Sequence, residues 1–187
     1  MGDARFEWIV EVMGVRPDDR ILEIGAGASP SVEYLAAPLR GGCVVAIDRS
    51  ATAIARSAKR HAALVDSGRV RLRHLALEDL RPDDVRDTFD KILAVNVNLF
   101  WTRRPTAELA TIRALLAPRG ALHLAYGYGD PGTRHPSTSP KPVADKLSEH
   151  LEEAGFTTET RFSGDLLCVT ATQARRRSAT ASAKRSS

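Results

Sequence analysis

The chain has 187 residues, a net charge of +4, 43% hydrophobic and 27% charged residues, values ordinary for a globular protein with one sizeable core. No apolar run approaches the roughly 20 residues that a membrane-spanning helix needs, and the N-terminus lacks the basic and apolar regions of a secretory signal. We therefore expect a cytoplasmic protein without membrane attachment, in which Cys43 and Cys168 are reduced, buried thiols.

The basic residues are concentrated near the C-terminal end. Residues 172–187 contain five Lys and Arg and no acid, and without those five the chain has 22 basic and 23 acidic residues. This segment is rich in Ser, Ala and Thr, so we expect a disordered, solubilising tail after one domain over residues 1–171. A basic charge confined to the tail argues against a nucleic-acid partner.

In chain order, apolar residues at helical spacing first predict a helix over residues 3–14. A short apolar strand at 21–24 leads into a glycine turn at 25–27, with Ser29 as N-cap and Pro30 as the first residue of a helix that reaches Arg40. An apolar strand at 43–47 ends at Asp48, and a helix is expected over 50–66. Alternation predicts an edge strand at 70–75, followed by a charged loop or short helix at 78–88.

The second half repeats the pattern. A strand at 89–96 is followed by a loop holding Leu99, Phe100 and Trp101, a helix at 105–116 and a strand at 121–126. The irregular segment 127–142 is long enough to indicate a functional or mobile loop. A helix at 143–154 precedes two antiparallel strands, 156–162 and 166–171, joined at 163–165. The alternation predicts an α/β fold with a Rossmann-like, doubly wound, mostly parallel sheet.

Two features at strand ends indicate a nucleotide site. Asp48 lies 23 residues after Gly25, about the spacing at which a carboxylate accepts hydrogen bonds from a ribose diol. Pro30 occupies the third glycine position of the dinucleotide fingerprint, so that motif is incomplete. Glu23, just before the turn, favours a ligand with an ammonium or sulfonium charge over a pyrophosphate. An NAD-dependent oxidoreductase is therefore a less favoured alternative.

At these positions the chain resembles class I S-adenosylmethionine-dependent methyltransferases. The resemblance rests on LEIGAG at 22–27, VVAID at 44–48, FDKILAVN at 89–96 and LLAPRGAL at 115–122, and it spans residues 5–171. It implies S-adenosylmethionine as cofactor, S-adenosylhomocysteine as product, and an antiparallel seventh strand between the fifth and sixth.

The resemblance also implies roles for single residues. Glu23 would hold the methionine ammonium group, the backbone of the glycine turn would face the methionine part, Asp48 would bind the ribose and Arg49 would flank the adenine. Ser29 and Ala76 depart from the family pattern, since a third glycine and an adenine-binding Asp are common there. The implied cofactor-binding residues are Glu23, Gly25, Ala26, Gly27, Asp48, Arg49, Leu77, Glu78 and Asn96, of which Glu78 or the Leu77 backbone replaces the missing Asp.

Methyl transfer from a sulfonium depends mainly on proximity and orientation, so no catalytic triad is needed. A general base is required only for a protonated acceptor, and the five His residues lack metal-ligand spacing, so no metal is expected. The acceptor pocket should lie over the ends of the fourth and fifth strands, and the candidates to line it are Asn96, Asn98, Trp101, Tyr126, Tyr128 and His135. The catalytic residue is not identified; the candidates are Asn96, Tyr128 and His135. Alternatively, Asn96 satisfies loop backbone, Trp101 packs in a loop core and His135 is a solvent-exposed loop residue.

The favoured function is methyl transfer to a small-molecule acceptor. The alternatives are an RNA or protein methyltransferase guided by the basic tail, and a non-catalytic S-adenosylmethionine binder. The fourth strand lacks the Asn/Asp-Pro-Pro-aromatic pattern of many relatives that methylate nucleic-acid or protein amide nitrogens, which disfavours those acceptors. Whether the protein forms a homodimer is left open.

Overall fold

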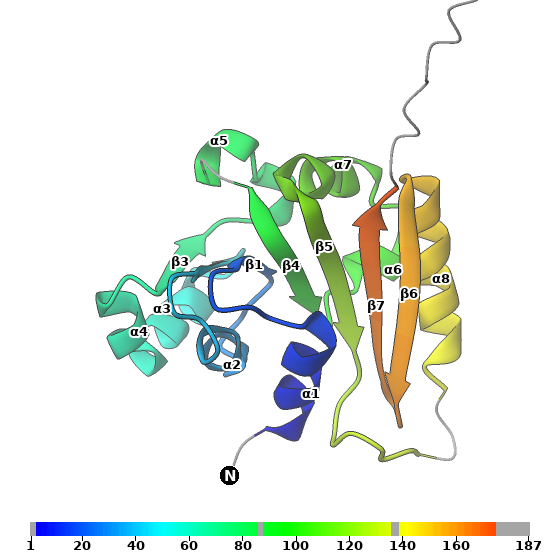
Figure 1. Cartoon of the computed structure of the whole chain (residues 1–187), viewed down its shortest axis with the longest axis horizontal. Coiled ribbons are helices and arrows are strands. Elements are labelled where there is room, and N and C mark those ends of the chain that lie inside the picture. Colours follow the sequence, from blue (N-terminus) through cyan, green and yellow to red (C-terminus); the bar gives the residue numbers. More distant parts are fainter. Residues whose placement is uncertain (1–2, 86–87, 136–138, 175–187) are drawn as a thin grey trace, which may run out of the picture.

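A computed structural model describes residues 3–85, 88–135 and 139–174. One seven-stranded sheet runs through it in the order β3-β2-β1-β4-β5-β7-β6 (Figure 1). All neighbouring strands are parallel except β7, which is antiparallel to both β5 and β6. This confirms the predicted fold class. The strands are β1 (Arg20–Ile24), β2 (Cys43–Asp48), β3 (Val70–His74), β4 (Phe89–Val95), β5 (Leu116–Tyr126), β6 (Phe156–Ser163) and β7 (Leu166–Gln173).

Helices cover both faces of the sheet, because neighbouring residues of each central strand point to opposite sides. Ile21 and Val44 pack with α1 and α2 on one face, whereas Leu22 and Val45 pack with α7 and α8 on the other. The helices are α1 (Ala4–Met13), α2 (Ser31–Ala36), α3 (Ala51–Arg60), α4 (Ala62–Asp66), η1 (Leu77–Asp79), α5 (Pro82–Val85), α6 (Leu99–Thr102), α7 (Thr106–Leu115) and α8 (Lys141–Glu153).

The helix after the glycine turn is shorter than predicted at both ends. It begins at Ser31 with Pro30 as N-cap, so the expected cap at Ser29 is wrong, although the Ser29 hydroxyl accepts a hydrogen bond from the Ser31 N–H at 3.0 Å. It ends at Ala36 instead of Arg40, because Pro38 has no N–H to continue the hydrogen-bond ladder.

The helix expected over 50–66 is divided into α3 and α4 at His61. The Ser50 hydroxyl caps α3 by accepting from the Ala53 N–H at 3.2 Å. Residues 99–102 form α6 where a loop was expected. β5 begins at Leu116, earlier than expected, because Leu116 pairs with Phe89 at the start of β4. The register of the two strands then shifts between Phe89 and Lys91.

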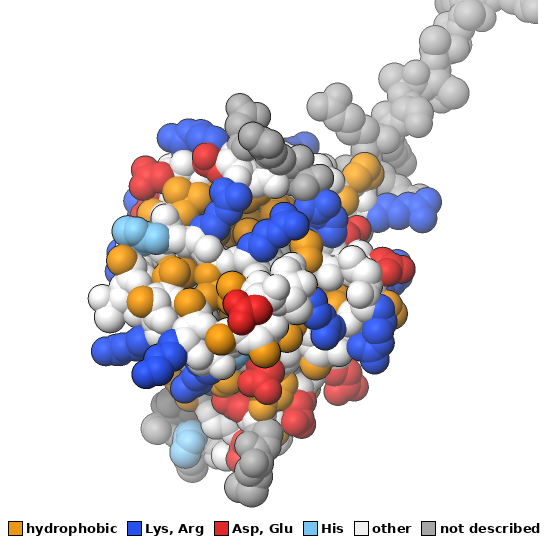
Figure 2. All heavy atoms as spheres, turned by 90° about the vertical axis from the view of Figure 1, so that its left-hand side faces the viewer, with side chains coloured by type: hydrophobic (Ala, Val, Ile, Leu, Met, Phe, Trp, Pro, Cys, Tyr) orange, Lys and Arg blue, Asp and Glu red, His pale blue; other side chains and the backbone are white. Residues whose placement is uncertain are grey.

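The remaining differences are small. α8 begins at Lys141 instead of residue 143, with a proline in its first turn. β7 continues to Gln173, past the predicted end of the domain at 171, and residues 175–187 of the predicted tail lie outside the described residues. β3 lies at the sheet edge as predicted, and its side of the molecule carries Lys and Arg together with acidic and hydrophobic side chains (Figure 2).

Two further observations concern the predictions about membrane helices and cysteines. Within the described ranges, no helix has both the length and the apolar character to cross a membrane. Cys43 and Cys168 are both free thiols, as predicted; Cys168 is buried, and Cys43 is only partly buried.

Candidate active site

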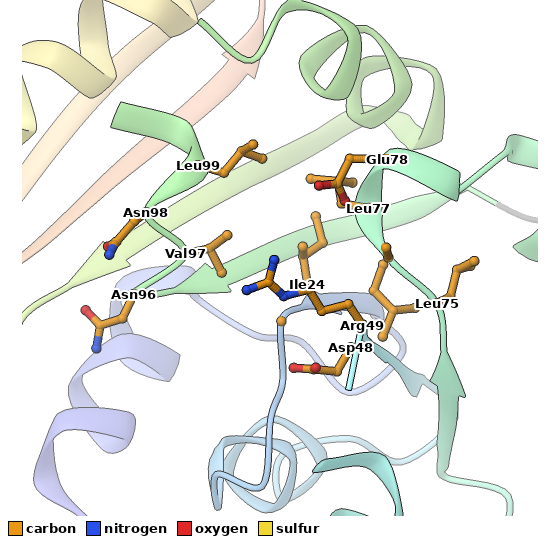
Figure 3. Close-up of a pocket in the computed structure, with 13 residues that line it drawn as sticks. Ile24, Asp48, Arg49, Leu75, Leu77, Glu78, Asn96, Val97, Asn98 and Leu99 are labelled. Atoms are coloured by element: carbon orange, nitrogen blue, oxygen red, sulfur yellow. The ribbon is translucent and has the colours of Figure 1, made fainter. Parts of the chain in front are cut away.

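Most of the predicted cofactor residues line a cavity of about 350 Å³ at the carboxyl ends of β1, β2 and β4 (Figure 3). The chain order reverses between β1 and β4, so the loops leaving these strands diverge and open a crevice. The cavity is lined by Ile24, Gly25, Ile47, Asp48, Arg49, Leu75, Ala76, Leu77, Glu78, Asn96, Val97, Asn98 and Leu99.

The glycine turn is held tightly against the end of β2. The N–H groups of Gly25 and Ala26 both donate to the Ile47 carbonyl, at 2.9 and 3.1 Å. Gly25 has a φ of +70°, and a Cβ there would lie 2.9 Å from Cγ2 of Val97. Only glycine combines this backbone conformation with the close approach of the loop after β4.

Asp48 ties the turn to the second strand. Its Oδ2 accepts from the Gly27 N–H at 2.8 Å, and its Oδ1 accepts from the Ser50 N–H at 2.7 Å. A carboxylate offers about four lone-pair positions, so two remain for a ligand. In Figure 3, Asp48 and Glu78 lie on opposite sides of the cavity.

Glu23 is a buried carboxyl group within β1, with 1% of its surface exposed. The Ser31 hydroxyl bonds to the side chain, but Oε2 has no hydrogen-bond partner in the described part of the chain. Burial raises the pKa of Glu23 to about 7, the charge of Asp48 acts in the same direction, and the Ser31 bond opposes both. A cationic group at this position would stabilise the ionised carboxylate.

The structure brings most of the predicted cofactor residues together. Gly25, Asp48, Arg49, Leu77, Glu78 and Asn96 line the cavity, as does Ala76. Glu23, Ala26 and Gly27 do not line it; Glu23 and Ala26 are buried. The apolar wall formed by Ile24, Leu75, Val97 and Leu99 was not predicted, because an apolar residue at a strand end has the same local pattern as a core residue.

Asn96 has a structural partner. It has a φ of +54°, the one positive value among non-glycine residues in the described ranges. Its Oδ1 accepts from the Gly127 N–H at 3.0 Å, and its Nδ2 donates to the Gly127 carbonyl at 3.3 Å. The side chain therefore satisfies loop backbone and joins the ends of β4 and β5, which was the alternative role expected for it.

A second cavity of about 490 Å³ lies next to the first, over the ends of β4 and β5. The two cavities share Asn96 and Asn98. All three catalytic candidates line the second one, together with Trp101 and Tyr126 as expected. Its lining comprises Asn96, Asn98, Trp101, Tyr126, Gly127, Tyr128, Gly129, His135, Ser139, Pro140, Val143, Asp165 and Leu167.

The irregular segment after β5 is fixed to the turn between β6 and β7. The Gly132 N–H donates to the Ser163 hydroxyl at 2.9 Å, the Asp165 N–H to the Thr133 carbonyl at 2.8 Å, and the His135 N–H to Asp165 Oδ2 at 2.7 Å. Residues 136–138 of this segment lie outside the described residues. The described part is thus a fixed wall of the second cavity, and His135 is exposed on it.

Two other side chains near the site, His123 and Tyr126, are bound to neighbouring protein groups. His123 is buried in β5 with Nδ1 3.1 Å from the Thr170 hydroxyl, and burial lowers its pKa to about 3. The Tyr126 hydroxyl donates to the Val97 carbonyl, and burial raises its pKa. No group of three or more His, Cys, Asp or Glu side chains that could hold a metal ion occurs among the residues with described positions.

Comparison with known proteins agrees with this geometry. Residues 22–122 match the family described as "Methyltransferase domain", and no similar sequence was found among curated proteins. A SAM-dependent methyltransferase from Aquifex aeolicus has a TM-score of 0.69 and 19% identity, covering 89% of this chain and 88% of its own. DhpI in complex with S-adenosylhomocysteine has a TM-score of 0.67 and 18% identity, with coverages of 90% and 83%.

Magnesium protoporphyrin IX methyltransferase from Synechocystis PCC 6803, with bound S-adenosylmethionine, has a TM-score of 0.63 and 16% identity over 90% of this chain and 76% of its own. At such identities these structures establish the shared fold, whereas the family match covers more than half of the sequence. The chain therefore belongs to the class I S-adenosylmethionine-dependent methyltransferases, and S-adenosylmethionine is its cofactor.

Proposed function

We propose that the protein methylates a small-molecule acceptor held in the second cavity. The observation that carries this proposal is the shared border of the two cavities at Asn96 and Asn98. A cofactor in the first cavity and an acceptor in the second would meet at the end of β4. The second cavity, at about 490 Å³, has a volume typical of small-molecule sites, which span roughly 300–1,000 Å³.

The residues that line the first cavity fit the cofactor, together with Glu23, which is buried in β1 just before the lining residues Ile24 and Gly25. The unpaired Oε2 of Glu23 suits the methionine ammonium group, and the remaining lone pairs of Asp48 suit the ribose hydroxyls. The apolar side chains of Leu75 and Leu77 suit the adenine ring, with Arg49 at its edge. Glu78 is the polar side chain that would replace the missing Asp at position 76.

When bound, S-adenosylmethionine supplies a methyl group on a positively charged sulfur, and the sulfur keeps the electron pair of the broken carbon–sulfur bond. The protein's own contribution is orientation, which is worth roughly 7–11 kcal/mol when both reactants are fixed. The paired hydrogen bonds between Asn96 and Gly127 hold the border of the two cavities in place. The Tyr126 hydroxyl is bound to the Val97 carbonyl and the Asn96 amide to Gly127, which leaves Tyr128 and His135 as candidates for a group that acts on the acceptor.

A small acceptor is supported further by the lining of the second cavity. Its described lining residues include no Lys or Arg, which a site for nucleic-acid phosphates would need. The similar protein from Synechocystis is named for a small molecule, magnesium protoporphyrin IX. A cytoplasmic location stays a prediction, supported by the two free cysteines.

Two measurements test the proposal. Calorimetry should show binding of S-adenosylmethionine and S-adenosylhomocysteine, weakened at least ten-fold in Asp48→Ala and unchanged in Asp66→Ala, an exposed control on α4. S-adenosylhomocysteine release should then be stimulated by members of a small-molecule panel. Release stimulated only by RNA or protein would contradict the small-molecule acceptor, and failure to bind either cofactor form would contradict the proposed site.

A further inference from the structure

The second cavity has one formal charge among its described lining residues, the carboxylate of Asp165. This residue lies in the turn between β6 and β7, at the opposite side of the cavity from β4. The Arg5 guanidinium, 5.7 Å from the Tyr128 ring centre, is paired with Asp3 at 3.3 Å. The charge of Asp165 therefore favours a positively charged ligand in this cavity.

The two oxygens of Asp165 differ in their partners. Oδ2 accepts the His135 N–H, and this bond fixes both the loop and the orientation of the carboxylate. Oδ1 is buried and has no hydrogen-bond partner among the described residues. Burying a carboxylate oxygen without a hydrogen-bond partner costs free energy, and a positively charged donor offsets this cost most effectively.

Three Trp and Tyr side chains also line the cavity. Trp101 and Tyr126 form its inner wall and Tyr128 its exposed mouth, where 74% of the Tyr128 surface is accessible. Rings of this kind stack on aromatic ligands and attract cations through their faces. The Trp101 indole N–H is also buried without a partner in the described ranges, and it is a donor for one neutral acceptor atom of the ligand.

The sheet sets the distance between the two ends of the cavity. Asn96 follows β4, Asp165 precedes β7, and β5 lies between them. Two strand spacings of about 4.8 Å place these ends roughly 10 Å apart, the length of a ring with a short side chain.

We propose that the methyl acceptor is an aromatic compound with a cationic amine, which is bound by Asp165 while the atom to be methylated lies beside Asn96 and Asn98. This inference rests on the proposed function and names the substrate class of the same cavity. Asp165 is a specificity-determining residue in this account. Acceptors that carry a carboxylate or phosphate at that end are excluded by charge repulsion.

The test compares matched ligand pairs on the full chain saturated with S-adenosylhomocysteine. Tyramine and 4-hydroxyphenylacetate are similar in size and opposite in charge, as are tryptamine and indole-3-acetate. By calorimetry, each amine should bind at least ten-fold more tightly than its acid partner. Asp165→Asn, whose side-chain oxygen still accepts the His135 N–H, should abolish this preference. Asp130→Asn removes an exposed charge from the loop after β5, outside the cavity lining, and should preserve the preference.

Three results would overturn the inference: equal or tighter binding of the acids, an amine preference that survives Asp165→Asn, or no binding of either amine. In each case intact S-adenosylhomocysteine binding would leave the proposed function standing. Loss of S-adenosylhomocysteine binding by the wild-type chain would instead remove the proposed function, and the inference with it.

Discussion

Replacing Glu23 by Gln should have opposite effects on stability and on cofactor binding. Glu23 is fully buried and its pKa is raised from 4.5 to about 7, chiefly by burial. The folded protein therefore keeps a proton on this group between pH 4.5 and 7, where the unfolded chain has lost it. Stability attributable to Glu23 is accordingly lost as the pH rises through this window.

The magnitude follows from the shift of the pKa. A shift from 4.5 to about 7 corresponds to roughly 3 kcal/mol of unfolding free energy above pH 7 and to none well below pH 4.5. The neutral amide removes this cost. Glu23→Gln should thus be more stable than the wild type at pH 8, by up to about 3 kcal/mol, and similar to it at pH 4.

Urea unfolding at pH 4, 6 and 8 measures the effect, with Glu11→Gln on the exposed side of α1 as control. The same variant should bind S-adenosylhomocysteine more weakly at pH 8, because the partner of the ammonium group is lost. At pH 6 the wild type should release a proton on binding, detected by calorimetry in buffers of different ionisation enthalpy. A difference in stability between variant and wild type that does not change with pH would refute this reasoning.

Three other predictions concern the turn, the loop and the tail. Gly25→Ala introduces a Cβ 2.9 Å from Val97 at a φ of +70°, so thermal unfolding should show a loss of about 1–3 kcal/mol. Gly164→Ala places a Cβ 2.0 Å from the Thr133 carbonyl oxygen, so acceptor binding should fall while S-adenosylhomocysteine affinity, measured by calorimetry, stays within two-fold. Equal loss of both would show that the loop is not confined to the acceptor side. Deleting residues 175–187 should leave cofactor affinity unchanged, and a large loss would give this segment a role in the site.

The cofactor side of the site could be predicted from the sequence because its signals are local. A glycine turn directly after an apolar strand, and an acid at the end of the next strand, meet at one edge of any parallel sheet. Gly25 and Asp48 were found in this way. The alternation of Arg71 and Arg73 along β3 is also a local signal, and it predicted the place of this strand at the sheet edge.

The acceptor side could be predicted only in part, because it depends on contacts between distant segments. Tyr128 and His135 were expected in the loop after β5, but no local pattern distinguishes Asp165 from an ordinary turn residue. Its position in the second cavity follows from the bonds between this turn and residues 132–135. The early end of α2 is a different case, since Pro38 was a visible local signal for it.

A crystal structure of the S-adenosylhomocysteine complex tests the central claim most directly. We predict that the ammonium group lies against Glu23, the ribose against Asp48, and the sulfur beside Asn96 and Asn98 facing the second cavity. A ligand bound elsewhere, or a sulfur atom turned away from that cavity, would contradict the account.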